Sequence, residues 1–236
     1  MEILAFPYAY GSASVYSELK AALGSKFAFY SFDYPGHGSR IEEKTVNSID
    51  KLADEALNHI EKYIHKPYCL LGYSMGGYVV FELYQKLKRL GKPLPKYIFL
   101  LASREPSWIH DKCDFEHSTL EDVKDILRKK NGTSEEILRE DDLISLLAPA
   151  IIADSIALRD YTCDNSETLP VECGVTIIRG NKETKLDNCK EEWEKALKRS
   201  AEYILVDGEH FFLFQGKDDV KKIVSTIISD RLSVIL

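Results

Sequence analysis

The strongest constraint on the fold of this chain is a regular alternation of short apolar runs with amphipathic segments. The first amphipathic segment, Ser14–Leu23, carries Val15, Leu19 and Leu23 at helical spacing. Turn signals typical of β-hairpins are missing between successive runs, so we expect parallel strands with helices on both faces, an α/β architecture. The predicted strands are Ile3–Phe6, Phe27–Phe32, Tyr68–Gly72, Tyr97–Leu101, Gly174–Arg179 and Tyr203–Val206. The other predicted helices of this pattern are Ile49–Ile64, Met75–Leu90, Lys190–Lys198 and Val220–Ile228.

The alternation breaks between residues 106 and 170. That stretch contains no convincing strand, and it reads as three helical segments, Leu120–Lys130, Ser134–Arg139 and Leu143–Tyr161. A chain of 236 residues is long enough to bury one large core without disulfides or metals. We therefore predict a single domain over residues 1–236, with residues 106–170 as a helical insertion within it.

Charge and hydropathy exclude several classes of protein. The chain has 31 basic and 38 acidic residues, and no basic run is interleaved with aromatic residues, so nucleic-acid binding is not expected. The longest charge-free stretches, Ile3–Ser17 and Pro67–Phe81, are 15 residues long. Both fall short of the roughly 20 apolar residues that cross a bilayer, and the start of the chain does not resemble a secretory signal. We expect a cytoplasmic protein without membrane contact.

The cysteines give no support for a metal site or a disulfide framework. They are five in number, scattered along the chain, and never form a C-x-x-C pair. We therefore expect ordinary reduced thiols and no bound metal.

The segment Gly72–Gly77, with the sequence GYSMGG, holds the most informative pattern in the chain. It matches G-x-S-x-G, with an apolar strand before it and a helix after it, which is the context of a nucleophile elbow. A nucleophile on so sharp a turn has strained backbone angles, and Gly72 and Gly76 lack the Cβ atoms that would clash there. The positive end of the following helix lies where an oxyanion would form. Ser74 is the predicted nucleophile.

A serine nucleophile needs a base, and His210 is the predicted one. In hydrolases with this elbow, the serine is followed along the chain by an acid and then by a histidine. His210 follows the last predicted strand and precedes the apolar run Phe211–Phe214. His110 and His117 both fall in the insertion, where solvated side chains are expected.

The acid that orients the base is expected after the preceding strand. The loop there, Gly180–Asp187, offers Glu183 and Asp187. Glu183 lies nearer to the end of the strand and is the favoured acid, although glutamate needs a backbone position different from that of aspartate. Asp187 remains the alternative.

Several segments in order along the chain resemble motifs of one enzyme family. They are Phe6–Ala13 (FPYAYGSA), Tyr34–Arg40 (YPGHGSR), Gly72–Gly77 (GYSMGG), Asn131–Leu138 (NGTSEEIL) and Gly208–Leu213 (GEHFFL). Taken together, the sequence resembles the type II (external) thioesterases of nonribosomal peptide and polyketide synthesis, members of the α/β-hydrolase superfamily. The resemblance implies the α/β-hydrolase fold and a lid formed by the insertion.

The resemblance also implies roles for individual residues. Ser74 corresponds to the nucleophile and His210 to the base, and the backbone N–H groups of Met75 and Ala9 correspond to an oxyanion hole. Glu183 stands where the family usually has an aspartate. Two other positions differ: Tyr73 replaces the usual histidine of the elbow, and Tyr10 replaces a glycine near the oxyanion loop, so that either tyrosine would alter the pocket.

The implied reaction is the hydrolysis of acyl thioesters on the phosphopantetheine arm of carrier proteins, which clears stalled synthases. The partner would be a carrier-protein domain that binds transiently, and neither a metal nor a bound cofactor is needed. Apolar residues of the insertion, Leu143–Leu147 with Ile151 and Ile152, line the acyl chamber or only pack the lid against the body.

Three other functions fit the same residues. An esterase of small free substrates would use the same triad, and so would an acyltransferase that passes the acyl group to an alcohol or amine. Because Glu183 departs from the family pattern, a non-catalytic protein that binds acyl carriers is the third alternative.

Overall fold

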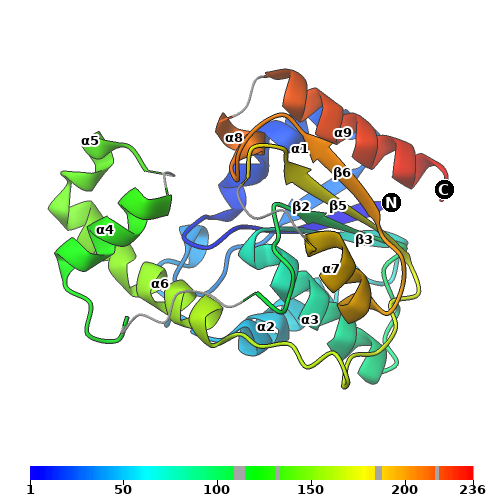
Figure 1. Ribbon diagram of the computed structural model, residues 1–236, viewed down its shortest axis with the longest axis horizontal. Coiled ribbons are helices and arrows are strands. Elements are labelled where there is room, and N and C mark those ends of the chain that lie inside the picture. The colour runs from blue at the N-terminus through cyan, green and yellow to red at the C-terminus, as the bar shows by residue number, and fades with distance from the viewer. Residues whose placement is uncertain (109–114, 131–132, 184–187, 216–217, 236) are drawn as a thin grey trace.

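The computed structural model describes residues 1–108, 115–130, 133–183, 188–215 and 218–235. Six strands form one sheet in the order β2-β1-β3-β4-β5-β6, and every neighbouring pair is parallel (Figure 1). The strands are β1 Glu2–Phe6, β2 Ala28–Ser31, β3 Tyr68–Tyr73, β4 Tyr97–Leu101, β5 Gly174–Gly180 and β6 Glu202–Val206. The predicted parallel α/β architecture is confirmed.

Both faces of the sheet are covered by helices, which explains why the strands are mostly apolar. Leu4 and Phe6 of β1 belong to one buried cluster, and Ile3 and Ala5, which point the other way, belong to a second. The first cluster includes residues of α2 Ile49–Ile60, α3 Met75–Arg89 and α7 Cys189–Leu197. The second includes residues of α1 Ser17–Leu23, α8 Phe212–Gln215 and α9 Asp218–Ser233. Figure 1 shows the two groups of helices on opposite sides of the sheet.

Some helix boundaries differ from the sequence-based expectation. The first predicted helix divides into a 3-10 turn, η1 Ala13–Tyr16, followed by α1. Tyr16 is buried at this junction, and its hydroxyl donates a hydrogen bond of 2.6 Å to the carbonyl of Phe6. The second predicted helix ends at Ile60, yet Ile64 beyond it is still buried in the same cluster. The apolar spacing therefore continued past the end of the helix.

Between β4 and β5, the described part of residues 106–170 forms three helices and no strand. The helices are α4 Leu120–Lys130, α5 Glu135–Leu138 and α6 Asp141–Asp160. Figure 1 shows α4 and α5 standing away from the sheet. The insertion has an apolar cluster of its own, formed by Val123, Leu127, Leu138, Ile144 and Ile151. Near the end of α6, Ala157 and Leu158 instead join the main core, so this one helix belongs to both parts.

The carboxyl ends of the parallel strands meet at one edge of the sheet, where open α/β sheets bind their ligands. The loop after β1 carries Ala9, and Ser74 directly follows β3. Glu183 follows β5, and His210 follows β6. The topology therefore brings together four residues that are far apart in the sequence.

Candidate active site

Ser74 lies on a strained turn between β3 and α3. Its backbone angles are φ 51° and ψ −114°, values that non-glycine residues rarely adopt. A Cβ atom on Gly72 would lie 2.3 Å from the carbonyl oxygen of Gly76, and one on Gly76 would lie 2.1 Å from the carbonyl oxygen of Phe6. The two glycines are therefore required for the close approach of strand and helix, as the G-x-S-x-G pattern predicted.

Hydrogen bonds from the neighbouring strand hold this turn in place. The Ser74 N–H donates to the carbonyl of Leu101 at 2.8 Å. The hydroxyl of Ser103, just after β4, donates to the carbonyl of Ser74 at 2.9 Å. The strained conformation is thus fixed by contacts from β4 as well as by its own sequence.

His210 lies within hydrogen-bonding distance of the predicted nucleophile. Its Nε2 atom is 3.0 Å from Ser74 Oγ, and 36% of its side chain is exposed, so water and substrate can reach it. The hydroxyl of Tyr73, a fully buried residue, donates to the carbonyl of His210 at 2.6 Å. The tyrosine that replaces the usual elbow histidine therefore anchors the loop that carries the base.

Glu183 lies on the other side of the imidazole. Its Oε2 atom is 3.3 Å from His210 Nδ1, and its Oε1 atom accepts a hydrogen bond of 3.1 Å from the Gly180 N–H. Burial raises the pKa of Glu183, but hydrogen bonds from His210 and Arg179 and the Arg179 charge outweigh this effect and lower the pKa to about 2. The carboxylate is thus ionised at neutral pH. Asp187, the alternative acid, lies outside the described residues.

Arg179 is a site residue that the sequence analysis missed. It is fully buried in β5, and its Nε and Nη2 atoms donate to the two carboxylate oxygens of Glu183 at 3.1 and 2.6 Å. Its Nη1 atom lies 2.9 Å from Cys189 Sγ and 3.5 Å from the carbonyl oxygen of Ser103. The available signal was a single charge inside an otherwise apolar strand, which requires a buried partner.

The residues predicted for the oxyanion hole lie at the same edge. Met75 is the first residue of α3, where backbone N–H groups have no partner in the preceding turn, and Ala9 is buried in the loop after β1. The next residue, Tyr10, has a φ of 71°. Its N–H donates to Asp154 Oδ2 at 2.6 Å, and its hydroxyl lies 2.9 Å from Ser155 Oγ. The loop that carries Ala9 is therefore fastened to helix α6.

Asp154 also binds a second loop of the body. Its Oδ2 atom is 3.0 Å from Nε2 of His37, which follows β2, and both side chains are buried. Burial lowers the pKa of His37, but the Asp154 carboxylate raises it above its usual value overall. The sequence analysis missed this pair, although a carboxylate between Ile151 and Ile156 on α6 is a signal for a buried polar contact.

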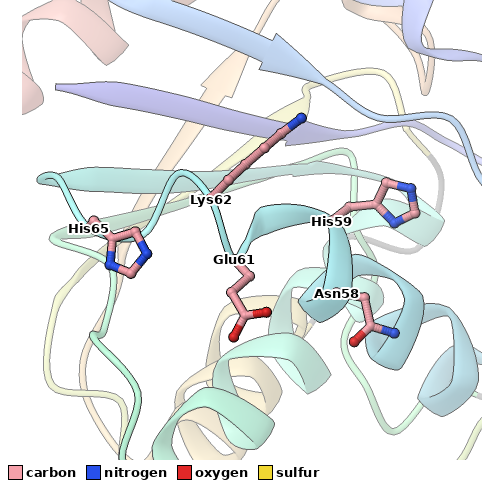
Figure 2. A pocket seen from close by; sticks show the side chains of 5 residues that line it. All are labelled: Asn58, His59, Glu61, Lys62 and His65. Carbon is pink, nitrogen blue, oxygen red and sulfur yellow. The ribbon is translucent and has the colours of Figure 1, made fainter.

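The remaining candidates do not join the site. His117 is exposed in the insertion, as predicted, and His110 lies outside the described residues. A shallow depression at the end of α2 is lined by Asn58, His59, Glu61, Lys62 and His65, and Figure 2 shows that these side chains diverge. Ser74, Glu183 and His210 do not line this depression.

The described residues contain no group of three or more His, Cys, Asp or Glu side chains that could hold a metal ion. They also contain no helix long and apolar enough to span a membrane.

Comparisons with known proteins agree with this geometry. The thioesterase domain family matches residues 1–230. Gramicidin S biosynthesis protein GrsT of Aneurinibacillus migulanus is 27% identical over 218 residues, which cover 92% of this chain and 84% of that protein. The medium-chain S-acyl fatty acid synthase thioesterase of Homo sapiens is 25% identical over 237 residues, covering 99% of this chain and 88% of that protein.

Solved structures show the same fold. ClbQ from the colibactin NRPS/PKS pathway has a TM-score of 0.86 and 20% identity, with 100% of this chain and 99% of that chain covered. The type II thioesterase BorB from the borrelidin biosynthetic cluster has a TM-score of 0.80 and 25% identity, with 95% and 91% covered. The elbow, the fold and the family match lead to one conclusion: this chain belongs to the thioesterase domain family and is a thioester hydrolase with the α/β-hydrolase fold.

Proposed function

We propose that this enzyme hydrolyses acyl thioesters carried on the phosphopantetheine arm of carrier proteins, through an acyl-enzyme on Ser74. The observation that carries the proposal is the continuous contact from Ser74 Oγ to His210 at 3.0 Å and from His210 to Glu183 at 3.3 Å. The names of these relatives assign GrsT to gramicidin S biosynthesis and describe BorB as a type II thioesterase from the borrelidin biosynthetic cluster. Their similarity to this chain supports a carrier-bound substrate.

In the first half of the reaction, Ser74 Oγ attacks the thioester carbonyl while His210 Nε2 takes the serine proton. Glu183 holds the imidazole through Nδ1 and stabilises the imidazolium that forms. The N–H groups of Met75 and Ala9 would hold the oxyanion, each contributing about 3 kcal/mol by analogy with other oxyanion holes. Collapse of the intermediate breaks the C–S bond, and His210 returns the proton to the departing phosphopantetheine thiol.

In the second half, His210 takes a proton from water as that water attacks the acyl-enzyme. A second tetrahedral intermediate then collapses, Ser74 recovers its proton from His210, and the carboxylic acid leaves. Every step uses groups of this chain and water, and the phosphopantetheine arm arrives with the partner.

The insertion would act as the lid over this site. Tyr10, beside the proposed oxyanion residue Ala9, packs against the apolar cluster of the insertion. Ile144 and Ile151, two of the residues considered for the acyl chamber, are buried within that cluster, whereas Leu146 is 58% exposed. The inner residues would therefore hold the lid together, and the exposed leucine would contact the substrate or the carrier.

The test is intact-mass analysis of an acyl-loaded carrier protein after incubation with the enzyme. We expect loss of the acyl mass from the carrier with the wild type and retention with Ser74→Ala. Parallel assays with a matching oxoester and with added alcohol or amine acceptors distinguish the alternatives. Faster hydrolysis of the oxoester would favour an esterase, and acyl transfer to an acceptor would favour an acyltransferase.

A further inference from the structure

The carboxylate of Glu183 accepts hydrogen bonds from Arg179 and Gly180 in addition to its contact with the His210 imidazole. Three N–H groups besides His210 donate to it: Arg179 Nε at 3.1 Å, Arg179 Nη2 at 2.6 Å and Gly180 N–H at 3.1 Å. Glutamate has one more rotatable bond than aspartate, so its carboxylate needs more restraint to stay in position. A two-point contact from a planar guanidinium supplies that restraint, whereas a lysine would bind as a single charge.

Arg179 and His210 share one oxygen of this carboxylate. Glu183 Oε2 lies 2.6 Å from Arg179 Nη2 and 3.3 Å from His210 Nδ1. The buried pair of charges has little solvent screening, since the side chains of Arg179 and Glu183 are 0% and 2% exposed. A positive charge in this position partly neutralises the carboxylate, and it therefore opposes the gain of a proton by His210.

The Arg179 guanidinium is also connected to the backbone of Ser74 through Ser103. Arg179 Nη1 lies 3.5 Å from the carbonyl oxygen of Ser103, whose hydroxyl donates to the Ser74 carbonyl at 2.9 Å. The Trp193 Nε1–H donates to the same Ser103 carbonyl at 3.2 Å. Ser74, His210, Glu183, Arg179 and Ser103 thus form a closed ring of contacts. Movement of the arginine would disturb both ends of the triad.

Other titratable groups near the pair come from every surrounding element. Burial raises the pKa of each of four such groups above its usual value, so all four are neutral near pH 7: Tyr73 on β3, Tyr78 on α3, Cys189 on α7 and Tyr203 on β6. The carboxylate of Glu105, in the loop after β4, acts electrostatically on Cys189 and Tyr203. Arg179 is the cation in direct contact with Glu183.

We propose that Arg179 is a positioning residue for the catalytic acid: its two-point contact holds the Glu183 carboxylate against His210, and its charge influences how the reactivity of Ser74 depends on pH. This inference rests on the proposed triad but not on the proposed substrate.

The experiment measures the rate at which a fluorophosphonate probe labels Ser74 as a function of pH. Labelling requires the nucleophile and a neutral base, so it does not depend on which acyl thioester the enzyme hydrolyses. For Arg179→Met we expect the rise in labelling rate to shift to higher pH by about one unit, because the opposing charge is gone. Arg179→Gln, which keeps hydrogen-bond donors without the charge, replaces this variant if it does not fold.

Arg179→Lys separates the two effects. It keeps the positive charge, so the rise should stay at the wild-type pH, but the lost two-point contact should lower the maximal rate by about tenfold. Arg231→Met is the matched control, since Arg231 makes a comparable two-point contact with Glu202 between α9 and β6. Its profile should coincide with that of the wild type.

Two results would overturn the inference. One is a neutral variant whose labelling rises at the wild-type pH, which would leave Arg179 with a structural role only. The other is an Arg179→Lys enzyme with the full wild-type rate, which would show that the two-point contact does not position the acid. If the carrier assay fails while the predicted shifts appear, the substrate assignment is wrong and the role of Arg179 stands.

Discussion

The edge of the sheet and the insertion differ in the interactions that fix their side chains: hydrogen bonds at the sheet edge and apolar packing in the insertion. At the sheet edge, Ser74, Glu183 and His210 are restrained by hydrogen bonds from three neighbouring strands or the loops that follow them. In the insertion, α4, α5 and α6 gather around five buried apolar side chains, and Leu146 remains 58% exposed. The proposed chemistry therefore lies where hydrogen bonds from the sheet hold each side chain, whereas the insertion has a smaller apolar core and leaves a large apolar side chain exposed.

One helix connects the two parts. Ile151 of α6 belongs to the cluster of the insertion, whereas Ala157 and Leu158 belong to the main core. Between them, Asp154 binds the backbone of Tyr10 and the imidazole of His37. The position of the insertion and the shape of the loop after β1 are therefore linked through the buried carboxylate of Asp154, beside the contact between the Tyr10 hydroxyl and Ser155.

The largest effect is expected at the edge of the sheet, when the site loses Glu183, the proposed acid. Glu183→Ala should lower kcat by about 1,000-fold, because His210 loses the group that orients it and stabilises its charge. Asp187→Ala should change kcat by less than about twofold. Steady-state kinetics of both variants assign the acid, and the reverse order of effects would mean that Asp187 serves instead.

The second prediction concerns stability at low pH. The pKa of Glu183 is about 2 in the folded protein against its ordinary value of 4.5, so its ionised form stabilises the fold above pH 4.5. This contribution should disappear as the pH falls from 4.5 to 2, and its full size is about 3 kcal/mol. Urea unfolding at several pH values measures it. The free energy of wild type relative to Glu183→Gln should fall by that amount, and a constant difference would contradict the low pKa.

Asp154→Asn tests the link between the two parts. The amide keeps the size of the side chain and an oxygen that can replace Oδ2, which makes both contacts, but it lacks the negative charge that strengthens them, so Tyr10 and His37 are held more weakly. We expect kcat for a small thioester to fall by about tenfold with little change in KM, because only the oxyanion loop is displaced. Ser155→Ala, which loses only the contact with the Tyr10 hydroxyl, is the control. Equal effects of both variants would exclude a specific role for Asp154.

The smallest effect is expected on the outer surface of the insertion. Leu146→Ala should change the free energy of unfolding by less than about 0.5 kcal/mol, because the side chain is exposed. Leu70→Ala, at a fully buried position of β3, should cost about 3 kcal/mol. Similar losses in the two variants would show that the insertion is packed as firmly as the body.

The residues of the proposed triad could be selected from sequence because each of them has a recognisable local context. Ser74 lies between a strand and a helix, and the end of a strand precedes both Glu183 and His210. The residues that contact the site from other parts of the chain have no such local sequence pattern. Tyr10 and Asp154 are 144 residues apart, and the Tyr73 hydroxyl meets the His210 carbonyl across 137 residues. Such contacts arise only when the whole chain is folded, so no local spacing reveals them.

Helix ends were predicted less well for a similar reason. Ile64 is buried against the same core as Ile60, but it lies beyond the end of α2. Burial continues there although the helix has ended, and the spacing of apolar residues indicates burial rather than helical structure. The strands, most of which are buried along nearly their whole length, were located more closely.

The most direct test of this account is to trap the acyl-enzyme with a slowly hydrolysed acyl-phosphopantetheine thioester, followed by mass spectrometry of the whole protein and of its peptides. We expect a mass increase equal to one acyl group, located on Ser74 in the peptide that contains Gly72–Gly77 and missing from Ser74→Ala. An acyl group on another residue, or undiminished hydrolysis by Ser74→Ala, would contradict it.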